Sequence, residues 1–377
     1  MSTHDNLSYA QRIRVLIVDD SAVMRRIIMS TLLKHDEIEV VGTSANGLDA
    51  IADIKRIKPD LVTMDIEMPK MDGLTALKQI RSFDQHLPII MFSSLTLRGA
   101  EATLDALTFG ASDYVAKPTN LNDSDEAFRV LNEQLVPKIK QLGSKKTFVR
   151  SLARAQTVTP QSLSPLAAQS SSNEVSSVRA GRIRVTLEAL CIGVSTGGPA
   201  ALTQLFSDWK VALSVPILIV QHMPPKFPEL LAIRLSTLGA VPAVEAVDGQ
   251  EIEAGHAYLA PGGRHMELYR SASGKVIIRL NDNAPECSCR PAVDVLFRSA
   301  AKVYGNRLLA MVLTGMGNDG LKGSAQVVQE GGRVLVQDEA SSVIWGMPGA
   351  VVNANLADKV LPLSEMAQEV VARLPKK

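Results

Sequence analysis

The sequence lacks an excess of charge of either sign. Its 377 residues include 40 Lys and Arg and 39 Asp and Glu, which gives a net charge of +1. Broad binding to nucleic acid or to a membrane surface needs a marked basic excess, so we expect neither. The sequence also has no run approaching the roughly 20 apolar residues that span a bilayer. Its first residues, MSTHDNLSYAQRIR, contain no apolar stretch typical of a signal peptide. These absences predict a cytoplasmic globular protein without membrane insertion, which we expect to be a monomer.

Cysteine is scarce as well, with only Cys191, Cys287 and Cys289. Cys191 lies in the apolar run ALCIGV, where a buried structural thiol is the usual interpretation. Cys287 and Cys289 form a C-x-C without a second ligand pair at zinc-site spacing. The sequence therefore favours neither a metal site nor a disulfide for this pair, and their role stays open.

The first third of the chain alternates between strand-like apolar runs and helical patterns. Five of each occur in strict order, and the strand-like runs are RVLIVDD, IEVVGTS, DLVTMDI, PIIMFSS and SDYVAKP. Strict alternation of this kind is typical of a doubly wound parallel sheet. We therefore predict an N-terminal, five-stranded, flavodoxin-like α/β domain over residues 12–135.

A different composition follows over residues 136–184. This segment becomes rich in Ser, Gln and Ala, and from Gly143 to Arg184 seven basic residues face only Glu174. We predict a flexible basic linker, which is either a solvated tether or a contact strip for an acidic partner. Alternation then resumes over residues 185–377 with hairpin-like stretches, which predicts a second α/β domain with a mostly parallel sheet and an antiparallel insert.

Polar side chains end four of the five predicted N-terminal strands. Asp19 and Asp20 end the first strand, Asp65 the third, Ser93 the fourth and Lys117 the fifth. The carboxyl ends of parallel strands meet at one edge, where these acids would repel one another without a cation. Oxygen ligands suit Mg²⁺, and Asp65 could then attack a phosphoryl group whose oxygens contact Lys117 and Ser93. The plainer alternative is a set of solvated acids.

These pieces resemble the receiver domain of two-component response regulators. The resemblance is carried by VDDS, MDIEMPKMDG, FSS and YVAKP, and it covers about Ile13 to Leu135. It implies Asp65 as the phosphoacceptor and a Mg²⁺ site formed by Asp19, Asp20, Asp65 and the main-chain carbonyl of Glu67. It also implies switch roles for Ser93, Tyr114 and Lys117.

A second group of reactive residues follows apolar runs in the C-terminal half. Ser195 follows LCIGV and precedes two glycines at a predicted helix start, His222 follows VPILIVQ, and Asp319 lies in LTGMGNDG directly after a predicted strand. Together they could form a nucleophile, a base and an orienting acid, with the Met316 amide as an oxyanion donor. Taken singly, His222 could be structural and Asp319 a turn residue.

The motifs IGVSTGGP, QHMPPKF, LAPGGRHMEL, RPAVDVLF and LTGMGNDG resemble the catalytic domain of the chemotaxis protein-glutamate methylesterases, the CheB family. The resemblance implies a phosphorylation-activated serine hydrolase that demethylates glutamate esters and deamidates glutamines on chemotaxis receptors. It implies Ser195, His222 and Asp319 as the triad, with the amides of Thr196 and Met316 as oxyanion donors. It also implies a chemotaxis histidine kinase as phosphodonor and no cofactor for the esterase.

Two other function classes fit less well. A receiver-coupled transcription factor would predict a compact basic helix-turn-helix module, whereas the second half is a large α/β domain without a clustered basic recognition helix. A nucleotide-binding module with GVSTGGP as its phosphate loop would need G-x-x-x-x-G-K-[ST], which is absent.

Overall fold

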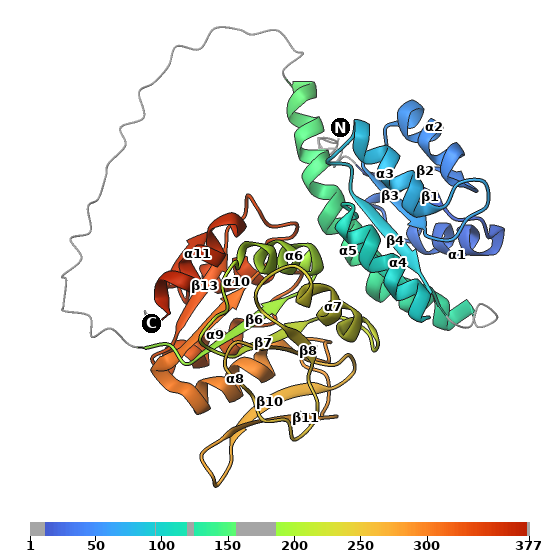
Figure 1. Ribbon diagram of the computed structural model, residues 1–377. Coiled ribbons are helices and arrows are strands. Elements are labelled where there is room, and N and C mark those ends of the chain that lie inside the picture. The colour runs from blue at the N-terminus through green and yellow to red at the C-terminus, as the bar shows by residue number, and fades with distance from the viewer. Residues whose placement is uncertain (1–11, 95, 119–123, 156–185, 375–377) are drawn as a thin grey trace, which may run out of the picture.

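The computed structural model describes residues 12–94, 96–118, 124–155 and 186–374. Its strands form a five-stranded sheet, a seven-stranded sheet and a two-stranded ribbon. Figure 1 shows that the five-stranded sheet belongs to the N-terminal part of the chain and the other two to the C-terminal part. In the described ranges no helix is both long enough and apolar enough to cross a membrane.

The five-stranded sheet has the order β2-β1-β3-β4-β5, and all of its strand pairs are parallel. Strands β3 and β4 are buried along their whole length, as expected when helices cover both faces of a parallel sheet. Its elements are β1 (Ile13–Val18), α1 (Ala22–Leu32), β2 (Ile38–Ser44), α2 (Gly47–Ile57), β3 (Leu61–Asp65), α3 (Gly73–Phe83), β4 (Ile89–Ser93), α4 (Leu97–Thr108), β5 (Asp113–Ala116) and α5 (Ser124–Ala155).

Helix α5 extends into the segment that we predicted to be a flexible linker. Its residues Val136, Ile139 and Leu142 are buried and share one hydrophobic cluster with strand β1. Residues that we assigned to the linker therefore pack against the N-terminal sheet. Residues 156–184 of the predicted linker lie outside the described residues, and the division of the chain at 135 and 185 stays a prediction.

The seven-stranded sheet has the order β14-β13-β12-β6-β7-β9-β8, again with parallel pairs throughout. Strands β10 and β11 form a separate antiparallel ribbon, so the predicted fold class of both halves is confirmed. The elements are β6 (Ala189–Val194), α6 (Gly198–Asp208), β7 (Ile217–Gln221), α7 (Phe227–Ser236), β8 (Ala243–Glu245), β9 (Ala257–Leu259), β10 (His265–Arg270), β11 (Val276–Asn281), α8 (Val293–Tyr304), β12 (Leu308–Val312), α9 (Leu321–Gln329), β13 (Arg333–Gln337), α10 (Met347–Asn353), β14 (Lys359–Leu361) and α11 (Leu363–Arg373).

The N-terminal and C-terminal halves contact each other through helix α4, which packs against α6 and α7. At this boundary the rings of Tyr114 and Phe227 stack, with centroids 5.1 Å apart and planes 9° from parallel. Arg234 of α7 forms an ion pair with Asp105 of α4 and donates a hydrogen bond of 2.8 Å to the Thr108 hydroxyl. One hydrophobic cluster accordingly includes buried residues from both halves.

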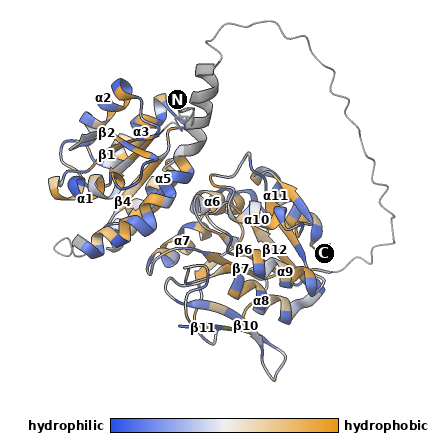
Figure 2. Cartoon of the chain, turned by 180° about the vertical axis from the view of Figure 1, so that it is seen from behind, coloured by the Kyte–Doolittle hydropathy of each residue, from blue (hydrophilic) through white to orange (hydrophobic). Residues whose placement is uncertain are grey.

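Figure 2 shows how hydrophobic and hydrophilic residues are distributed, and the distribution is alike in the two halves. Hydrophobic residues concentrate on the central strands, whereas the helices carry hydrophilic residues on part of their surface. Each sheet is thus covered by apolar side chains on both faces. Polar side chains lie in the loops at its carboxyl edge.

Candidate active site

A cleft of about 560 Å³ lies at the carboxyl edge of the seven-stranded sheet. Ser195, Thr196, His222 and Met316 line it from the C-terminal half. Residues of the N-terminal half line the same cleft, among them Asp113, Tyr114 and Lys138. The cleft therefore lies between the two halves of the molecule, with the predicted nucleophile and base on one wall.

Ser195 lies in the turn between β6 and α6, as its position in the sequence predicts. Its amide donates to the Thr314 carbonyl at 3.0 Å, and its own carbonyl accepts from Gln221 Nε2 at 3.0 Å. Gly197 has φ +77°, and a Cβ on Gly198 would overlap the Gln221 side chain, so glycine is needed at both positions of this tight turn. The turn fixes the serine backbone, while its hydroxyl makes no hydrogen bond within the described part of the chain.

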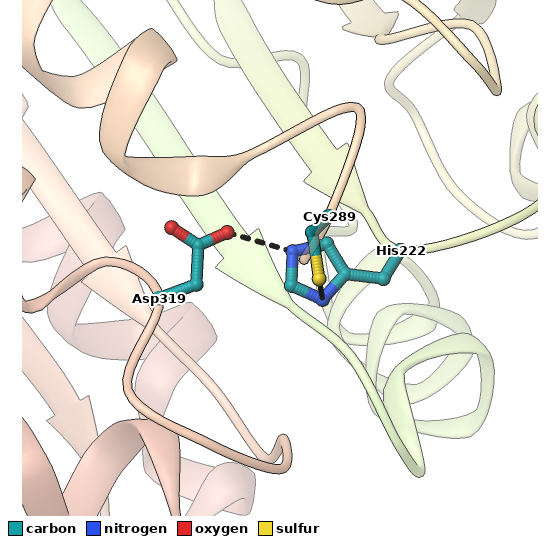
Figure 3. A group of neighbouring side chains, drawn as sticks. All are labelled: His222, Cys289 and Asp319. Atoms are coloured by element: carbon teal, nitrogen blue, oxygen red, sulfur yellow. Dashed lines mark hydrogen bonds and ion pairs between the residues drawn. The ribbon is translucent and has the colours of Figure 1, made fainter. Parts of the chain in front are cut away.

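His222 follows β7 and forms a hydrogen-bonded pair with Asp319. Its Nε2 lies 2.8 Å from Asp319 Oδ2, and the two side chains are 12% and 2% exposed. Figure 3 shows the carboxylate on one side of the imidazole ring and the Cys289 sulfur beside the other ring nitrogen. Because Asp319 takes Nε2, the nitrogen left to receive a proton from a nucleophile is Nδ1.

The position of Asp319 corrects one expectation. We predicted it directly after a strand, but β12 ends at Val312 and a loop precedes the aspartate. The start of helix α8 holds its carboxylate instead: Oδ2 accepts from the Val293 amide at 2.7 Å, and Oδ1 accepts from the Asp294 amide at 2.9 Å. Amides at a helix N-terminus stabilise a negative charge, so the loop geometry is fixed by tertiary contacts rather than by strand register.

Burial and pairing pull the two pKa values of this pair in opposite directions. Burial on its own would lower the pKa of His222, but hydrogen bonds with Asp319 and Cys289 and the charges of both residues raise it to about 9. Burial on its own would raise the pKa of Asp319, but His222 and the amides of Val293 and Asp294 hold it below its usual value. The pairing with Asp319 therefore stabilises the imidazolium that forms when the neutral ring accepts a proton.

The amides expected to form an oxyanion hole both lie at the cleft. Thr196 is adjacent to Ser195, and Met316 follows Gly315, whose amide donates to the Ile344 carbonyl at 3.0 Å. Neither the Thr196 amide nor the Met316 amide donates a hydrogen bond to another described residue. Both amides are thus available to an oxyanion, as acyl transfer requires.

The loop of Asp319 also has the spacing G-x-G-x-x-G, from Gly315 to Gly320, after β12 and before α9. A dinucleotide-binding loop with this spacing leaves its helix amides open to a pyrophosphate. In this chain the buried carboxylate of Asp319 lies within the loop and accepts the Gly320 amide at 2.9 Å. The negative charge of this carboxylate would repel a phosphate, so the loop does not fit a dinucleotide-binding role.

The side chain of Thr196 joins the cleft to the N-terminal half. Its hydroxyl donates a buried hydrogen bond of 2.7 Å to Asp113 Oδ2, at the start of β5. Asp113 is also paired with the Lys138 ammonium of α5 at 2.9 Å, and that ammonium donates to the Tyr114 carbonyl at 2.7 Å. Sequence reasoning missed this contact, since no local pattern relates residues 83 positions apart.

The acids predicted for the N-terminal site meet at the carboxyl edge of the five-stranded sheet. Lys117 Nζ lies 2.5 Å from Asp65 Oδ2 and 3.4 Å from Asp19 Oδ2. Burial raises the pKa of Asp65 to about 6, with Lys117 opposing this shift and the charge of Asp19 adding to it. The structure thus brings together a buried carboxylate and the lysine that would face its phosphoryl group.

The side chains present at this edge fit a magnesium ion. Asp19, Asp20 and Asp65 each offer a carboxylate oxygen within 4.8 Å of the others. The buried Oδ2 of Asp19 has no hydrogen-bond partner in the described structure, only the Lys117 ammonium 3.4 Å away. An oxygen-only cluster with an unsatisfied buried oxygen is the donor set that Mg²⁺ prefers. Glu67 is exposed beside it, and its amide donates to Asp65 Oδ1 at 3.3 Å.

The remaining predicted residues of this half lie on two sides of the site. Ser93 lines a small cavity with Asp65 and Lys117, and its hydroxyl donates to the Gly99 carbonyl of α4 at 3.0 Å. Tyr114 is buried and faces the C-terminal half through its stack on Phe227. The serine therefore contacts the first turn of α4, and the tyrosine contacts α7.

Cys289 is a residue that sequence reasoning set aside and that the structure brings to the site. Its Sγ lies 3.5 Å from His222 Nδ1. Cys287 lines the same cleft and is exposed, while Cys191 is buried in β6 as expected. The C-x-C spacing gave no signal, because the neighbouring imidazole comes from a strand end 67 residues earlier.

Known proteins resemble both halves of the chain. The family described as CheB methylesterase matches residues 190–370, and the response regulator receiver domain matches residues 15–129. The protein-glutamate methylesterase/protein-glutamine glutaminase of Trichodesmium erythraeum is 48% identical over 96% of this chain and 99% of its own length. Its namesake in Nocardioides sp. is 47% identical over 96% of this chain and 95% of its own.

Two solved structures are each similar to one part of the chain. The crystal structure of the Thermotoga maritima CheB methylesterase catalytic domain is 38% identical, with a TM-score of 0.48, and covers 50% of this chain and 99% of that one. The response regulator domain of Thermotoga maritima CheB is 40% identical, with a TM-score of 0.33, and covers 36% of this chain and 98% of that one. With relatives this similar along nearly its whole length, the chain belongs to the family of protein-glutamate methylesterases/protein-glutamine glutaminases that join a receiver domain to a CheB methylesterase domain.

Proposed function

We propose that this protein hydrolyses glutamate γ-methyl esters on methyl-accepting chemotaxis receptors and deamidates particular receptor glutamines. The observation that carries the proposal is the His222–Asp319 pair at 2.8 Å, with Ser195 lining the same cleft. Acyl transfer needs a buried acid that orients a histidine and a serine hydroxyl within reach of that histidine, and here the serine lines the same cleft. The receptors are the substrate, and the enzyme acts in the cytoplasm as a monomer.

The reaction follows from the roles of these three side chains. Ser195 Oγ attacks the ester carbonyl carbon, and its proton moves to His222 Nδ1. That proton then passes to the departing methoxide, which leaves as methanol while the glutamyl group stays on Ser195. Water, deprotonated by the same nitrogen, attacks the acyl-enzyme and releases glutamate and the free serine. A glutamine amide follows the same path with ammonia as the leaving group.

Asp319 and two backbone amides support this sequence electrostatically. Hydrogen bonding of Nε2 to Asp319 places the ring proton on that nitrogen and leaves Nδ1 as the acceptor. The amides of Thr196 and Met316 donate to the oxygen that becomes negative in the tetrahedral intermediate. Loss of one such donor typically costs about 3 kcal/mol of transition-state stabilisation.

We further propose that phosphorylation of Asp65 by a chemotaxis histidine kinase activates the esterase. Asp19, Asp20 and Asp65, with the carbonyl of Glu67, would hold a Mg²⁺ ion, which neutralises phosphoryl oxygens when it is bound. Lys117 leaves its pairing with Asp65 to contact the phosphoryl group. Ser93 and Tyr114, the other two switch residues, change their contacts in response.

The strand that precedes Lys117, β5, also makes two contacts with the esterase domain. Lys117 follows β5 directly, and β5 begins with Asp113 and Tyr114, which contact Thr196 and Phe227. The unphosphorylated receiver lines the cleft from this strand. A shift of β5 and of the Ser93 loop would loosen that docking, and about 1.4 kcal/mol of differential stabilisation gives tenfold activation.

The decisive experiment measures methanol released from methylated receptor membranes, with and without a small-molecule phosphodonor and Mg²⁺. We expect release that the phosphodonor stimulates and that a serine-directed reagent abolishes. Ser195→Ala should stop release while the receiver still incorporates phosphate at Asp65. Release that continues in Ser195→Ala would point to another nucleophile and overturn the assignment.

A further inference from the structure

The esterase cleft holds a nucleophilic side chain that the reaction proposed above does not use. Cys289 lines the cleft, and its Sγ lies 3.5 Å from His222 Nδ1, close enough for a hydrogen bond between thiol and imidazole. The other ring nitrogen of His222 is held by Asp319 at 2.8 Å. Figure 3 shows the three side chains in this order, with the ring between the sulfur and the carboxylate. A thiol, a base and an orienting acid are the parts of an activated cysteine.

The backbone around Cys289 is fixed by a tight turn. Glu286 and Cys289 exchange two backbone hydrogen bonds, of 3.1 and 2.8 Å, which close this turn. Its two central residues, Cys287 and Ser288, have positive φ. The Glu286 side chain accepts hydrogen bonds of 2.9 and 2.6 Å from Arg298 of α8. The sulfur is therefore held beside the imidazole by a turn that is itself attached to a helix.

We propose that Cys289 is a peroxide-sensitive thiol whose oxidation to a sulfenic acid switches the esterase off. Its sulfur attacks one oxygen of hydrogen peroxide, so that an S–O bond forms and the O–O bond breaks. The thiol proton passes to His222 Nδ1 and then to the departing hydroxide, which leaves as water. The sulfur loses two electrons and the peroxide gains them, so one thiol and one peroxide give one sulfenic acid and one water. Asp319 stabilises the imidazolium that exists between the two proton transfers.

The surroundings of the other two cysteines favour the neutral thiol. Cys191 is buried in β6, and burial raises the pKa of its thiol. Cys287 is exposed, but desolvation at its sulfur and the charges of Asp319 and Asp294 raise the pKa of its thiol. Because the thiolate is the reacting form, both shifts slow oxidation. We therefore expect peroxide to attack Cys289 first, although Cys287 is the more exposed residue of the two.

Oxidation would affect the esterase through His222. A sulfenic acid adds an oxygen and an O–H donor beside Nδ1, which is the nitrogen that receives the Ser195 proton in the proposed reaction. A hydrogen bond from that donor occupies the lone pair of Nδ1. General base catalysis typically contributes at least about 100-fold, so complete oxidation should lower the rate at least about tenfold. A thiol reductant reverses the oxidation and should restore the rate. This inhibitory consequence rests on the proposed function, whereas the reactivity of the thiol does not.

Reactivity is tested first, without reference to methanol release. The full-length chain is treated with hydrogen peroxide in the presence of dimedone, which traps sulfenic acids, and the labelled peptides are quantified by mass spectrometry. We expect Cys289 to be labelled at least about tenfold faster than Cys287 or Cys191. Cys287→Ser, the matched control on the same turn, should leave the labelling of Cys289 unchanged. Labelling of Cys287 as fast as that of Cys289 would overturn the proposal, as would the absence of label on Cys289.

Two kinds of variant test whether the imidazole activates the thiol. His222→Gln, or Asp319→Asn if that variant does not fold, should slow the labelling of Cys289 at least about tenfold. Ser195→Ala removes the proposed nucleophile but keeps the base, so Cys289 should be labelled at the original rate. Thermal unfolding shows which variants are folded. Original labelling rates in folded His222→Gln and Asp319→Asn proteins would refute the activation of the thiol.

Inhibition is tested second, by measuring methanol release after peroxide treatment without dimedone and scaling each variant to its own untreated rate. Unmodified protein and Cys287→Ser should lose activity in parallel, and dithiothreitol should restore it. Cys289→Ser should keep its rate under the same treatment, and equal inhibition of this variant would overturn the switch. A chain that is labelled on Cys289 but releases no methanol even without peroxide would instead contradict the proposed function and leave the reactive thiol standing.

Discussion

The hydrogen bond between Thr196 and Asp113 gives the sharpest prediction about regulation. The Thr196 hydroxyl is the donor in a buried 2.7 Å bond to a carboxylate of the receiver. Thr196→Val removes the hydroxyl, keeps the side-chain shape and leaves the backbone amide in place. A hydrogen bond to a charged group is worth about 1.5–3 kcal/mol, and Asp113 retains its ion pair with Lys138. Docking should weaken by that amount.

Weaker docking of the receiver should raise the basal rate of methanol release if the docked receiver limits access to the cleft. At about 1.4 kcal/mol for each factor of ten, basal methanol release should rise about 10-fold or more, until the open state predominates. The ratio of phosphodonor-stimulated to basal release should fall correspondingly. Both rates are measured on methylated receptor membranes, and thermal unfolding of the variant shows whether it stays folded.

Two comparisons isolate the hydrogen bond. Thr108→Val removes a hydroxyl that accepts a bond from Arg234 at the exposed edge of the same boundary, and its basal rate should change less than about twofold. In a double-mutant cycle, Asp113→Ala should add little once Thr196 is already valine. A folded Thr196→Val protein with the basal rate and stimulation ratio of the original would refute the reasoning.

Three further predictions concern the two sites and the receiver core. Asp65→Asn should reduce the ratio of stimulated to basal methanol release to about one, and stimulation that persists would place the phosphoacceptor elsewhere. The hydrolysis rate should increase with pH through about 9, because the pKa of His222 is raised and only its neutral form accepts a proton. Asp319→Asn should lower the maximum rate and move this rise to lower pH, since it removes a charge that stabilises the protonated ring; a pH profile that does not move would contradict that cause. Ile139→Ala should destabilise the receiver by about 2–5 kcal/mol, measured by chemical denaturation, because the side chain is fully buried against the sheet; a loss below about 1 kcal/mol would argue that this part of α5 is not in its core.

The order and type of the elements could be predicted because alternation of apolar strands and amphipathic helices is a local property. The runs ending at Asp19, Asp65 and Lys117 are all strands of one parallel sheet, so their side chains meet at its carboxyl edge. The end of α5 was harder to predict. Its pattern weakens after Leu142, although the described helix continues to Ala155.

The esterase site could be predicted only in part, because two of its residues follow strands whereas the others are placed by loops. Ser195 and His222 follow strands β6 and β7, which are neighbours in the sheet, and the register pairs Val194 with Gln221. Asp319 reaches the same place through a loop that the amides of α8 hold. Cys289 comes from the loop before that helix, and nothing in its spacing connects it to His222. Contacts fixed by loops leave no periodic signal.

Strand β5 can couple the two sites because its two ends face different partners. Lys117 at its carboxyl end pairs with Asp65, and Asp113 at its start binds Thr196, whose own amide faces the cleft. Strand β5 is the edge strand of its sheet and, among the described strands, pairs only with β4, but its first three residues are buried. A closely packed interior transmits strain, so a displacement at one end of the strand should reach the other end. Thr196, whose amide we propose as an oxyanion donor, therefore also contacts the receiver.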